Sequence, residues 1–400
     1  MFAIETDQKL NRRFAALQGS FFATYAGTSF FSYILQQKGI ANVYIGLLGA
    51  LTSCSSTLVQ PVWGNLCDRY RCHRIFYIIS SIATPLLYIW IIRSGGLWEL
   101  AVCALLSGMF INCIQNMGNG WVSSLNAEGY RINYGASRSC GSLAFAIMAA
   151  LLGKAINSLG YPGLVGGMAL CGLVCILVSF TIPKSSAPAA RTSEKTEEGP
   201  RLREGLRILL RQREYVVVVL SGFLAMTGVA GVNSYFSGYL ATLGASATVV
   251  GLGNFTYAIA EVPFMFLFKG LSERFSFRTL FTVSLFVHGL QCALVGLSPN
   301  YTCAILSMLL QGLAFGTLVP CLQAYTAQHI EPRYMSTAQL FTSSVSLSAS
   351  MIFGSLVASA LSRWFPLSTT FVLVSLFSFA GCGLYAGFML LEGSKQKMTP

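Results

Sequence analysis

Twelve long apolar segments constrain this chain more than any other feature of its sequence. Each has roughly 18 or more mostly apolar residues, enough for a helix to cross a hydrocarbon layer about 30 Å thick. Because lipid offers the backbone no hydrogen-bond partners, such segments must be helical. They lie near residues 14–36, 43–66, 75–92, 98–121, 136–156, 161–182, 215–240, 248–271, 279–297, 301–324, 336–361 and 368–391. The sequence therefore predicts an all-α integral membrane protein with twelve transmembrane helices.

The placement of charge predicts how the chain is oriented. Only 10% of the residues are charged, against about 25% in soluble domains. The net charge of +12 raises the alternative of nucleic-acid binding. If the N-terminus is cytoplasmic, however, the external loops contain only four basic residues: Lys38, Arg93, Lys154 and Arg363. This positive-inside bias predicts a multi-pass protein of the cell (inner) membrane with both termini in the cytoplasm and no nucleic-acid partner.

Residue patterns typical of enzymes and metal sites are missing from the sequence. The 12 cysteines are scattered, without paired CxxC spacing, and are typical of small packing residues. There is no Gly-rich phosphate loop after a strand, no HExxH and no GxSxG. We expect neither a metal nor a cofactor, and a protein that is not an enzyme.

A polar stretch over residues 183–214 separates the segments six and six. Its first part has the composition of a linker, and apolar residues recur at helical spacing from Leu202 to Leu210, which predicts a surface helix. The predicted organisation is an N-terminal six-helix half over residues 1–182, a cytoplasmic linker over 183–214 and a C-terminal six-helix half over 215–400.

The two halves repeat each other. When Phe31-Ser32 is aligned with Phe236-Ser237, Gly39 falls on Gly244 and Asp68-Arg69 on Glu273-Arg274, without a gap. Parallel repeats of six-helix halves are the plan of secondary transporters that work by alternating access, with substrate bound between the halves near mid-membrane. The repeat therefore predicts a transporter.

The loop after the second segment carries a motif. It reads Gly64-Asn-Leu-Cys-Asp68-Arg69 and ends at Arg74, and it resembles the G-x-L-x-D-R-x-x-x-R signature of the major facilitator superfamily. The resemblance implies the major facilitator fold. We expect Gly64 to allow a close helix approach, and the charged residues to form a gating cluster that breaks when the halves rock. Their counterparts in the second half are Glu273 and Arg274. The alternative is a charged loop that only snorkels.

Further matches are similar to one branch of this superfamily: the lactose permease, phenylpropionate permease and nucleoside–proton symporter group. They are Gly135–Phe145, Gly244–Pro263 and Ser336–Ser355. The resemblance implies that Arg138 binds substrate hydroxyls, that Phe145 replaces a stacking tryptophan and that Glu261 takes the place of a sugar-binding glutamate. Departures from lactose permease are Gly120, Gln291, Gln311 and Ala314, where that permease or its relatives carry binding or coupling residues. Most of the family's proton-coupling set is thus absent.

Ionisable residues inside membrane segments are expensive and usually functional. Glu261 shares a helix face with Tyr257 and Asn254. A buried carboxyl group takes up protons more readily than one in water, so Glu261 is the candidate proton carrier. The alternative is a structural ion pair with Arg138 or a plain hydrogen bond. His288, at the centre of the ninth segment, is a second coupling candidate, or else a satisfied core histidine.

Polar residues also mark the predicted cavity. The fourth segment has a stripe of amides, which favours a pore lining over a helix contact, and Tyr25 joins it from the first segment. The stripe consists of Asn112, Gln115, Asn116 and Asn119. Of these polar groups, we expect Asn116, Asn119, Tyr25 and Tyr257 to bind substrate.

The predicted function is proton-coupled import of a small polar organic solute, such as a sugar, oligosaccharide or nucleoside, by a monomer in the lipid bilayer. Alternatives are a drug or metabolite exporter, an uncoupled uniporter and a receptor with a transporter fold. Exporters of the superfamily usually carry a Gly-Pro-rich fifth helix, and Leu143 to Ile156 contains no proline.

Overall fold

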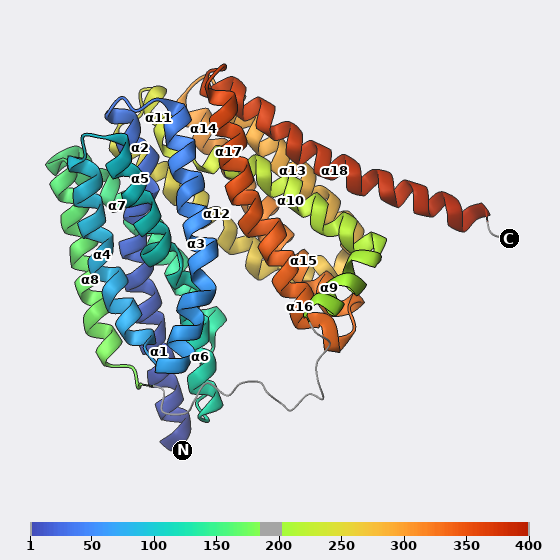
Figure 1. Cartoon of the computed structure of the whole chain (residues 1–400), viewed down its shortest axis with the longest axis horizontal. Coiled ribbons are helices and arrows are strands. Elements are labelled where there is room, and N and C mark those ends of the chain that lie inside the picture. Colours follow the sequence, from blue (N-terminus) through green and yellow to red (C-terminus); the bar gives the residue numbers. More distant parts are fainter. Residues whose placement is uncertain (1, 185–201, 399–400) are drawn as a thin grey trace. The chain divides into compact units, whose positions relative to one another are not determined.

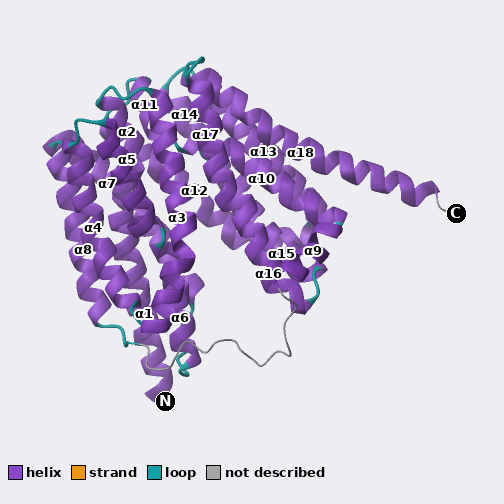
Figure 2. Cartoon of the chain, in the orientation of Figure 1, coloured by secondary structure: helices purple, strands orange, loops and turns teal. Residues whose placement is uncertain are grey.

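A computed structural model describes residues 2–184 and 202–398 of the chain. These residues form helices joined by short loops, and no strand is present among them (Figure 2). The first group of helices comprises α1 (Phe2–Tyr25), η1 (Ala26–Phe30), α2 (Phe31–Gln37), α3 (Asn42–Tyr70), α4 (His73–Arg93), α5 (Leu97–Ser107), η2 (Gly108–Asn112), α6 (Ile114–Ala127), α7 (Tyr134–Leu159) and α8 (Tyr161–Phe180).

A second group follows the helix α9 (Leu202–Arg211), which lies where the sequence predicts an amphipathic helix. It comprises α10 (Arg213–Asn233), α11 (Phe236–Thr242), α12 (Ala247–Arg274), α13 (Phe277–Leu297), α14 (Tyr301–Ser307), α15 (Leu310–His329), α16 (Pro332–Ser343), η3 (Ser344–Ala349), α17 (Ser350–Ser362) and α18 (Leu367–Met398) (Figure 1).

Ten spans in the described part of the chain are long and apolar enough to cross a membrane. The first and eighth predicted segments are not among these ten, and they correspond to α1 with its continuation and to α12. Together they give the twelve membrane helices that the sequence predicts. Large apolar side chains on the outer face of α8 are exposed, as expected for contact with lipid: Leu170, Leu177 and Phe180.

The helices gather into two compact units. Unit 1 contains the described residues of Met1–Ile40, Leu51–Glu194 and Ser237–Ile259, and unit 2 those of Ala41–Ala50, Lys195–Phe236 and Ala260–Pro400. Helices α3 and α12 therefore each contribute one end to either unit. The predicted division into residues 1–182, 183–214 and 215–400 stays a prediction, and most of the linker, residues 185–201, lies outside the described residues.

The sequence repeat is visible in matching turns. After α2, Gly39 has a φ of 72° and Ile40 N donates to Leu35 O at 3.1 Å; after α11, Gly244 has a φ of 84° and Ala245 N donates to Leu240 O at 3.0 Å. Both turns close a helix with glycine in the left-handed region, where a Cβ atom would be strained. The alignment of Gly39 with Gly244 thus reflects the same backbone geometry.

Each unit has an aromatic core. In unit 1, Phe14, Phe21 and Tyr77 are almost completely buried with Trp121, and the Phe14 and Trp121 rings meet edge to face at 5.6 Å. In unit 2, the rings of Phe281 of α13 and Tyr385 of α18 also meet edge to face, with their centres 4.8 Å apart. In an edge-to-face pair, the positive edge of one ring lies on the negative face of the other. This preferred geometry helps to fix how the helices that carry the rings pack.

Candidate functional site

Unit 1 brings together the α1 and α7 residues that the sequence marked for substrate binding. The Arg138 guanidinium carbon lies 4.1 Å from the centre of the Phe22 ring, and Arg138 Nη1 donates to Ser142 Oγ at 3.0 Å. Arg138 therefore lies against the neighbouring helix, held by a cation–π contact and a hydrogen bond one turn along its own helix. The half-buried guanidinium keeps further donors for a ligand.

Tyr25 and Phe145 extend the same face. Their ring centres are 6.1 Å apart, and Tyr25 also stacks on Phe21 at 6.2 Å. Glycine at position 141 permits this packing, because a Cβ atom there would lie 2.6 Å from Phe22 Cδ2. The result is an aromatic wall beside the Arg138 guanidinium, an arrangement suited to stacking a flat or ring-shaped solute.

A polar group next to this wall was missed in the sequence analysis. Gln18 of α1 is 1% exposed, its Nε2 donates to Tyr77 Oη at 3.2 Å, and its Oε1 has no hydrogen-bond partner among the described residues. A buried amide oxygen without a partner costs free energy. The sequence could have indicated this residue, because Gln18 precedes Tyr25 by two helical turns and therefore lies on the same face of an otherwise apolar segment.

The fourth predicted segment is interrupted. It consists of α5, a π-helical turn η2 and α6. Side chains of other helices donate to carbonyl groups of this turn: Trp63 Nε1 donates to Met109 O at 3.0 Å, and Ser80 Oγ donates to Phe110 O. Asn112 lies in the turn and Asn119 is exposed on α6, while the side chains of Gln115 and Asn116 lie outside the described residues.

In unit 2, the ionisable residue Glu261 pairs with a neutral amide. Gln311 Nε2 of α15 donates to Glu261 Oε1 of α12 at 3.1 Å. Glu261 is half-buried and Gln311 is fully buried. The two helices approach so closely here that a Cβ atom on Gly312 would lie 2.8 Å from the carbonyl carbon of Ala260. The carboxylate thus has a neutral hydrogen-bond donor, a residue that the sequence analysis treated only as a departure from lactose permease.

The other polar residues of this region lie as follows. Asn254 is buried and donates to Ser237 Oγ at 3.0 Å within unit 1, so its amide serves packing, while Tyr257 is half-buried. His288 is fully buried in α13, with Nδ1 2.9 Å from Ser284 O of the preceding turn and Nε2 without a partner among the described residues. A coupling role for His288 stays a prediction.

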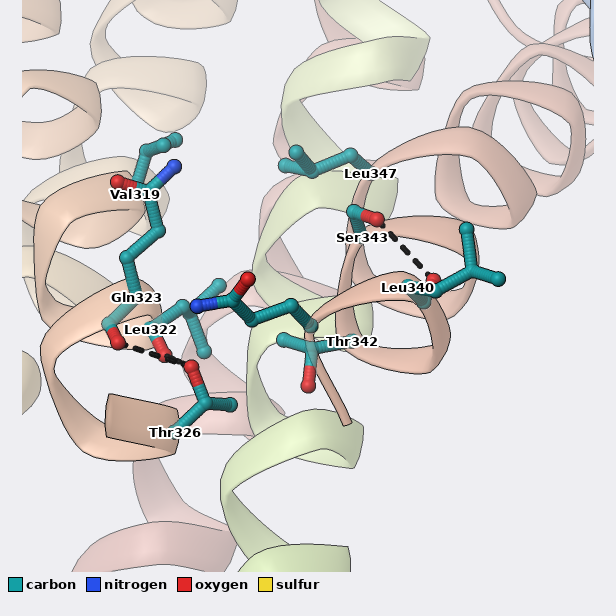
Figure 3. Close-up of a pocket in the computed structure, with 9 residues that line it drawn as sticks. Val319, Leu322, Gln323, Thr326, Leu340, Thr342, Ser343 and Leu347 are labelled. Carbon is teal, nitrogen blue, oxygen red and sulfur yellow. Dashed lines mark hydrogen bonds between the residues drawn. The ribbon is translucent and has the colours of Figure 1, made fainter. Parts of the chain in front are cut away.

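A cavity of about 510 Å³ lies between α15 and α16 of unit 2. Its nine lining residues are apolar or neutral and polar: Val319, Leu322, Gln323, Thr326, Gln339, Leu340, Thr342, Ser343 and Leu347. Thr326 Oγ1 donates to Gln323 O at 2.8 Å and Ser343 Oγ to Leu340 O at 3.1 Å, so both hydroxyl oxygens can still accept (Figure 3). Gln323 and Gln339 are exposed within membrane segments, where exposure to lipid would be costly. We therefore expect these two amides to face water or a ligand.

Helix irregularities recur at matching places in the repeat. The first segment contains the 3₁₀ turn η1 and the seventh breaks between α10 and α11, while the fourth contains η2 and the tenth breaks between α14 and α15. Interrupted membrane helices are tolerated where they line a cavity, and they are the usual sign of a transporter's binding site.

The predicted gating residues make contacts within unit 1 or are exposed. Arg74 donates to Ile182 O and lies 5.7 Å from the Phe180 ring, so it ties the start of α4 to the end of α8. Arg69, Glu273 and Arg274 are exposed. The side chain of Asp68 lies outside the described residues.

The close helix approach expected at Gly64 is not observed in the described part of unit 1. A Cβ atom on Gly64 would lie 4.0 Å from Met117 Cε, which leaves room for a methyl group. Other glycines make tighter contacts, such as Gly108 against α3, and the role expected of Gly64 stays a prediction.

Residues 14–373 match the sequence profile described as the MFS_1 like family. The chain belongs to this family. It is 23% identical over 396 residues to the uncharacterized transporter YwbF of Bacillus subtilis (strain 168), covering 98% of this chain and 97% of that protein. It is 24% identical over 371 residues to the maltose permease of Geobacillus stearothermophilus, covering 92% and 90%.

Solved structures share the fold of the family. The nucleoside transporter NupG superposes with a TM-score of 0.79 at 15% sequence identity, over 95% of this chain and 99% of that chain. The chain is thus a multi-pass membrane transporter with the major facilitator fold, and not an enzyme. Its partners are a small-molecule substrate and the lipid bilayer.

Proposed function

We propose that the chain is a secondary active transporter that imports a small, neutral, polar organic solute together with protons. The substrate class follows from the side chains that each unit offers to a ligand: aromatic rings and Arg138 in unit 1, and amides, hydroxyls and Glu261 in unit 2. Hydroxyl-rich solutes such as sugars, oligosaccharides or nucleosides pair with all of these groups. The similarity to a maltose permease and to a nucleoside transporter supports this class.

The pairing of Glu261 with Gln311 is the observation that carries the coupling proposal. While it is ionised, the Glu261 carboxylate between α12 and α15 can accept a hydrogen bond from the Gln311 amide, and while it is neutral it can hold a proton. Neither state requires a second charged group nearby. Protonation therefore changes the net charge of the site by one unit, which is what links substrate movement to a proton gradient.

A uniporter is the second candidate. The neutral side chains of Gln291, Gln311 and Ala314 stand where relatives of lactose permease carry ionisable groups, and this favours transport without coupling. The two candidates differ in whether proton flux accompanies solute flux.

The same proposal includes orientation and gating. We place both termini in the cytoplasm of a cell whose inner membrane holds the protein as a monomer, with six-helix halves over residues 1–182 and 215–400. Asp68, Arg69 and Arg74 form a charge cluster that opens and closes on the cytoplasmic side, and Glu273 and Arg274 are their counterparts in the second half. The basic residues of the internal loops support this orientation.

The test is solute-induced proton movement. De-energised cells that express the protein are suspended in weak buffer and pulsed with sugars, oligosaccharides and nucleosides while external pH is recorded. Alkalinisation with one solute, abolished by Glu261→Gln, is the expected result. Downhill uptake of a labelled solute without any pH change would refute coupling and establish uniport. Uptake of none of the solutes would refute the proposed substrate class.

A further inference from the structure

The turn between α3 and α4 brings together two cysteines that the transport proposal does not use. Cys67 lies in the last turn of α3, and Cys72 is the N-cap residue of α4. Their Sγ atoms are 3.7 Å apart. Disulfide sulfurs are about 2.05 Å apart, so these two need to approach by roughly 1.7 Å. A side-chain rotation with a small backbone shift can supply such a movement.

The two thiols differ in access. Cys67 is fully buried, whereas Cys72 is half-buried at the surface of the turn. A reagent in water can reach Cys72, while Cys67 can react only with a group already attached to its neighbour. This difference is the one that separates an attacking from a resolving cysteine.

The backbone and the charge of the turn also favour a reaction of Cys72 with a reagent from the water. Arg71 adopts a φ of 54°, in the left-handed region that residues other than glycine rarely adopt. This change in backbone direction leads the chain from α3 into α4. Arg69 and Arg71 are exposed beside the cysteines. An anionic reagent is therefore attracted to Cys72.

We propose that Cys67 and Cys72 form a redox-active dithiol that an anionic low-molecular-weight disulfide, such as oxidised glutathione, converts into an intramolecular disulfide. The Cys72 thiolate first attacks one sulfur of oxidised glutathione, which forms a mixed disulfide and releases one glutathione thiolate. The Cys67 thiolate then attacks Cys72 Sγ, which forms the Cys67–Cys72 bond and releases the second glutathione. The two protons lost by the cysteines end on the two glutathione thiols, and one disulfide is reduced for each one formed.

The sequence itself provides the assay. Trypsin cleaves after Arg69 and Arg71, so the disulfide is the only covalent link between the peptide that ends at Arg69 and the peptide that begins at Cys72. Purified full-length protein is treated with oxidised glutathione, its remaining thiols are alkylated, and the digest is analysed by mass spectrometry with and without a reductant.

Three variants separate the steps. The wild type is expected to yield the linked peptide pair and to lose it with reductant. Cys67→Ser is expected to stop at the mixed disulfide, with glutathione retained on Cys72. Cys72→Ser is expected to leave Cys67 as a thiol. Cys140→Ser, which removes an exposed cysteine on α7, is the matched control and should leave the linked pair unchanged.

Two results would overturn the proposal. One is wild-type protein that retains glutathione on Cys72 without forming the linked peptides. The other is wild-type protein in which both cysteines remain alkylatable thiols while Cys140 becomes modified. Neither result depends on which solute the protein transports, so failure here is distinct from failure of the proposed function.

Discussion

Replacing Gly312 by alanine tests whether the contact between α12 and α15 positions the Glu261–Gln311 pair. The added Cβ atom would lie 2.7 Å from Phe264 Cδ2 and 2.8 Å from the carbonyl carbon of Ala260, and closer still to Ala260 O. Carbon atoms pack at about 3.5–4.0 Å, so the helices must separate by roughly 1 Å at this point. Overpacking of this kind costs about 1–3 kcal/mol.

The same shift acts directly on the site. Gln311 precedes the substituted residue, and its 3.1 Å bond to Glu261 would lengthen toward about 4 Å, beyond hydrogen-bond range. We expect Gly312→Ala to lower the thermal midpoint of the detergent-purified protein and to abolish accumulation of substrate in membrane vesicles.

The matched control is Gly270→Ala on α12. No heavy atom of the described residues lies within 4 Å of the position of a Cβ atom there. Alanine also favours a helix over glycine by about 1 kcal/mol, so Gly270→Ala should be neutral or stabilising. A Gly312→Ala protein with unchanged thermal midpoint and unchanged accumulation would refute the argument that this close contact holds the pair in place.

Three further predictions address the remaining parts of the site. Arg138→Lys keeps the charge but loses the flat guanidinium on Phe22, so the apparent substrate affinity should fall roughly tenfold; equal affinities measured by substrate protection or uptake would contradict a binding role. Gln323→Ala should raise KM for uptake about tenfold, from the loss of about 1–1.5 kcal/mol of hydrogen bonding, with little change in the maximal rate; the reverse pattern would place the cavity outside the substrate path. Asp68→Asn should slow uptake without much change in KM, whereas a pure loss of affinity would contradict the gating role.

The sequence predicted the architecture because membrane helices are specified by local composition. Twelve apolar segments and a gap-free repeat are sufficient for the fold, and Gly39 and Gly244 show that the repeat extends to individual turns. The breaks inside the helices were not predictable. The π turn η2 accepts hydrogen bonds from two residues of distant segments, Trp63 and Ser80. Such irregularities depend on tertiary contacts rather than on local sequence.

The site was partly predictable. Resemblance to the family pointed to Arg138, Phe145 and Glu261, and the structure places the first two on one wall with Phe22 and Tyr25. Gln18 was missed because a single amide in an apolar run gives a weak signal. Gln311 was interpreted only as a departure from relatives, since its donor bond to Glu261 joins helices 50 residues apart in the sequence.

The central claim is that Glu261 carries the proton that drives accumulation. The most direct test compares Glu261→Gln with wild-type protein in the same vesicles, measuring both exchange of labelled for unlabelled solute and accumulation driven by an imposed pH gradient. A glutamine can still accept a hydrogen bond but cannot release a proton. The account predicts that the variant exchanges solute but fails to accumulate it. Accumulation at the wild-type level would contradict the account.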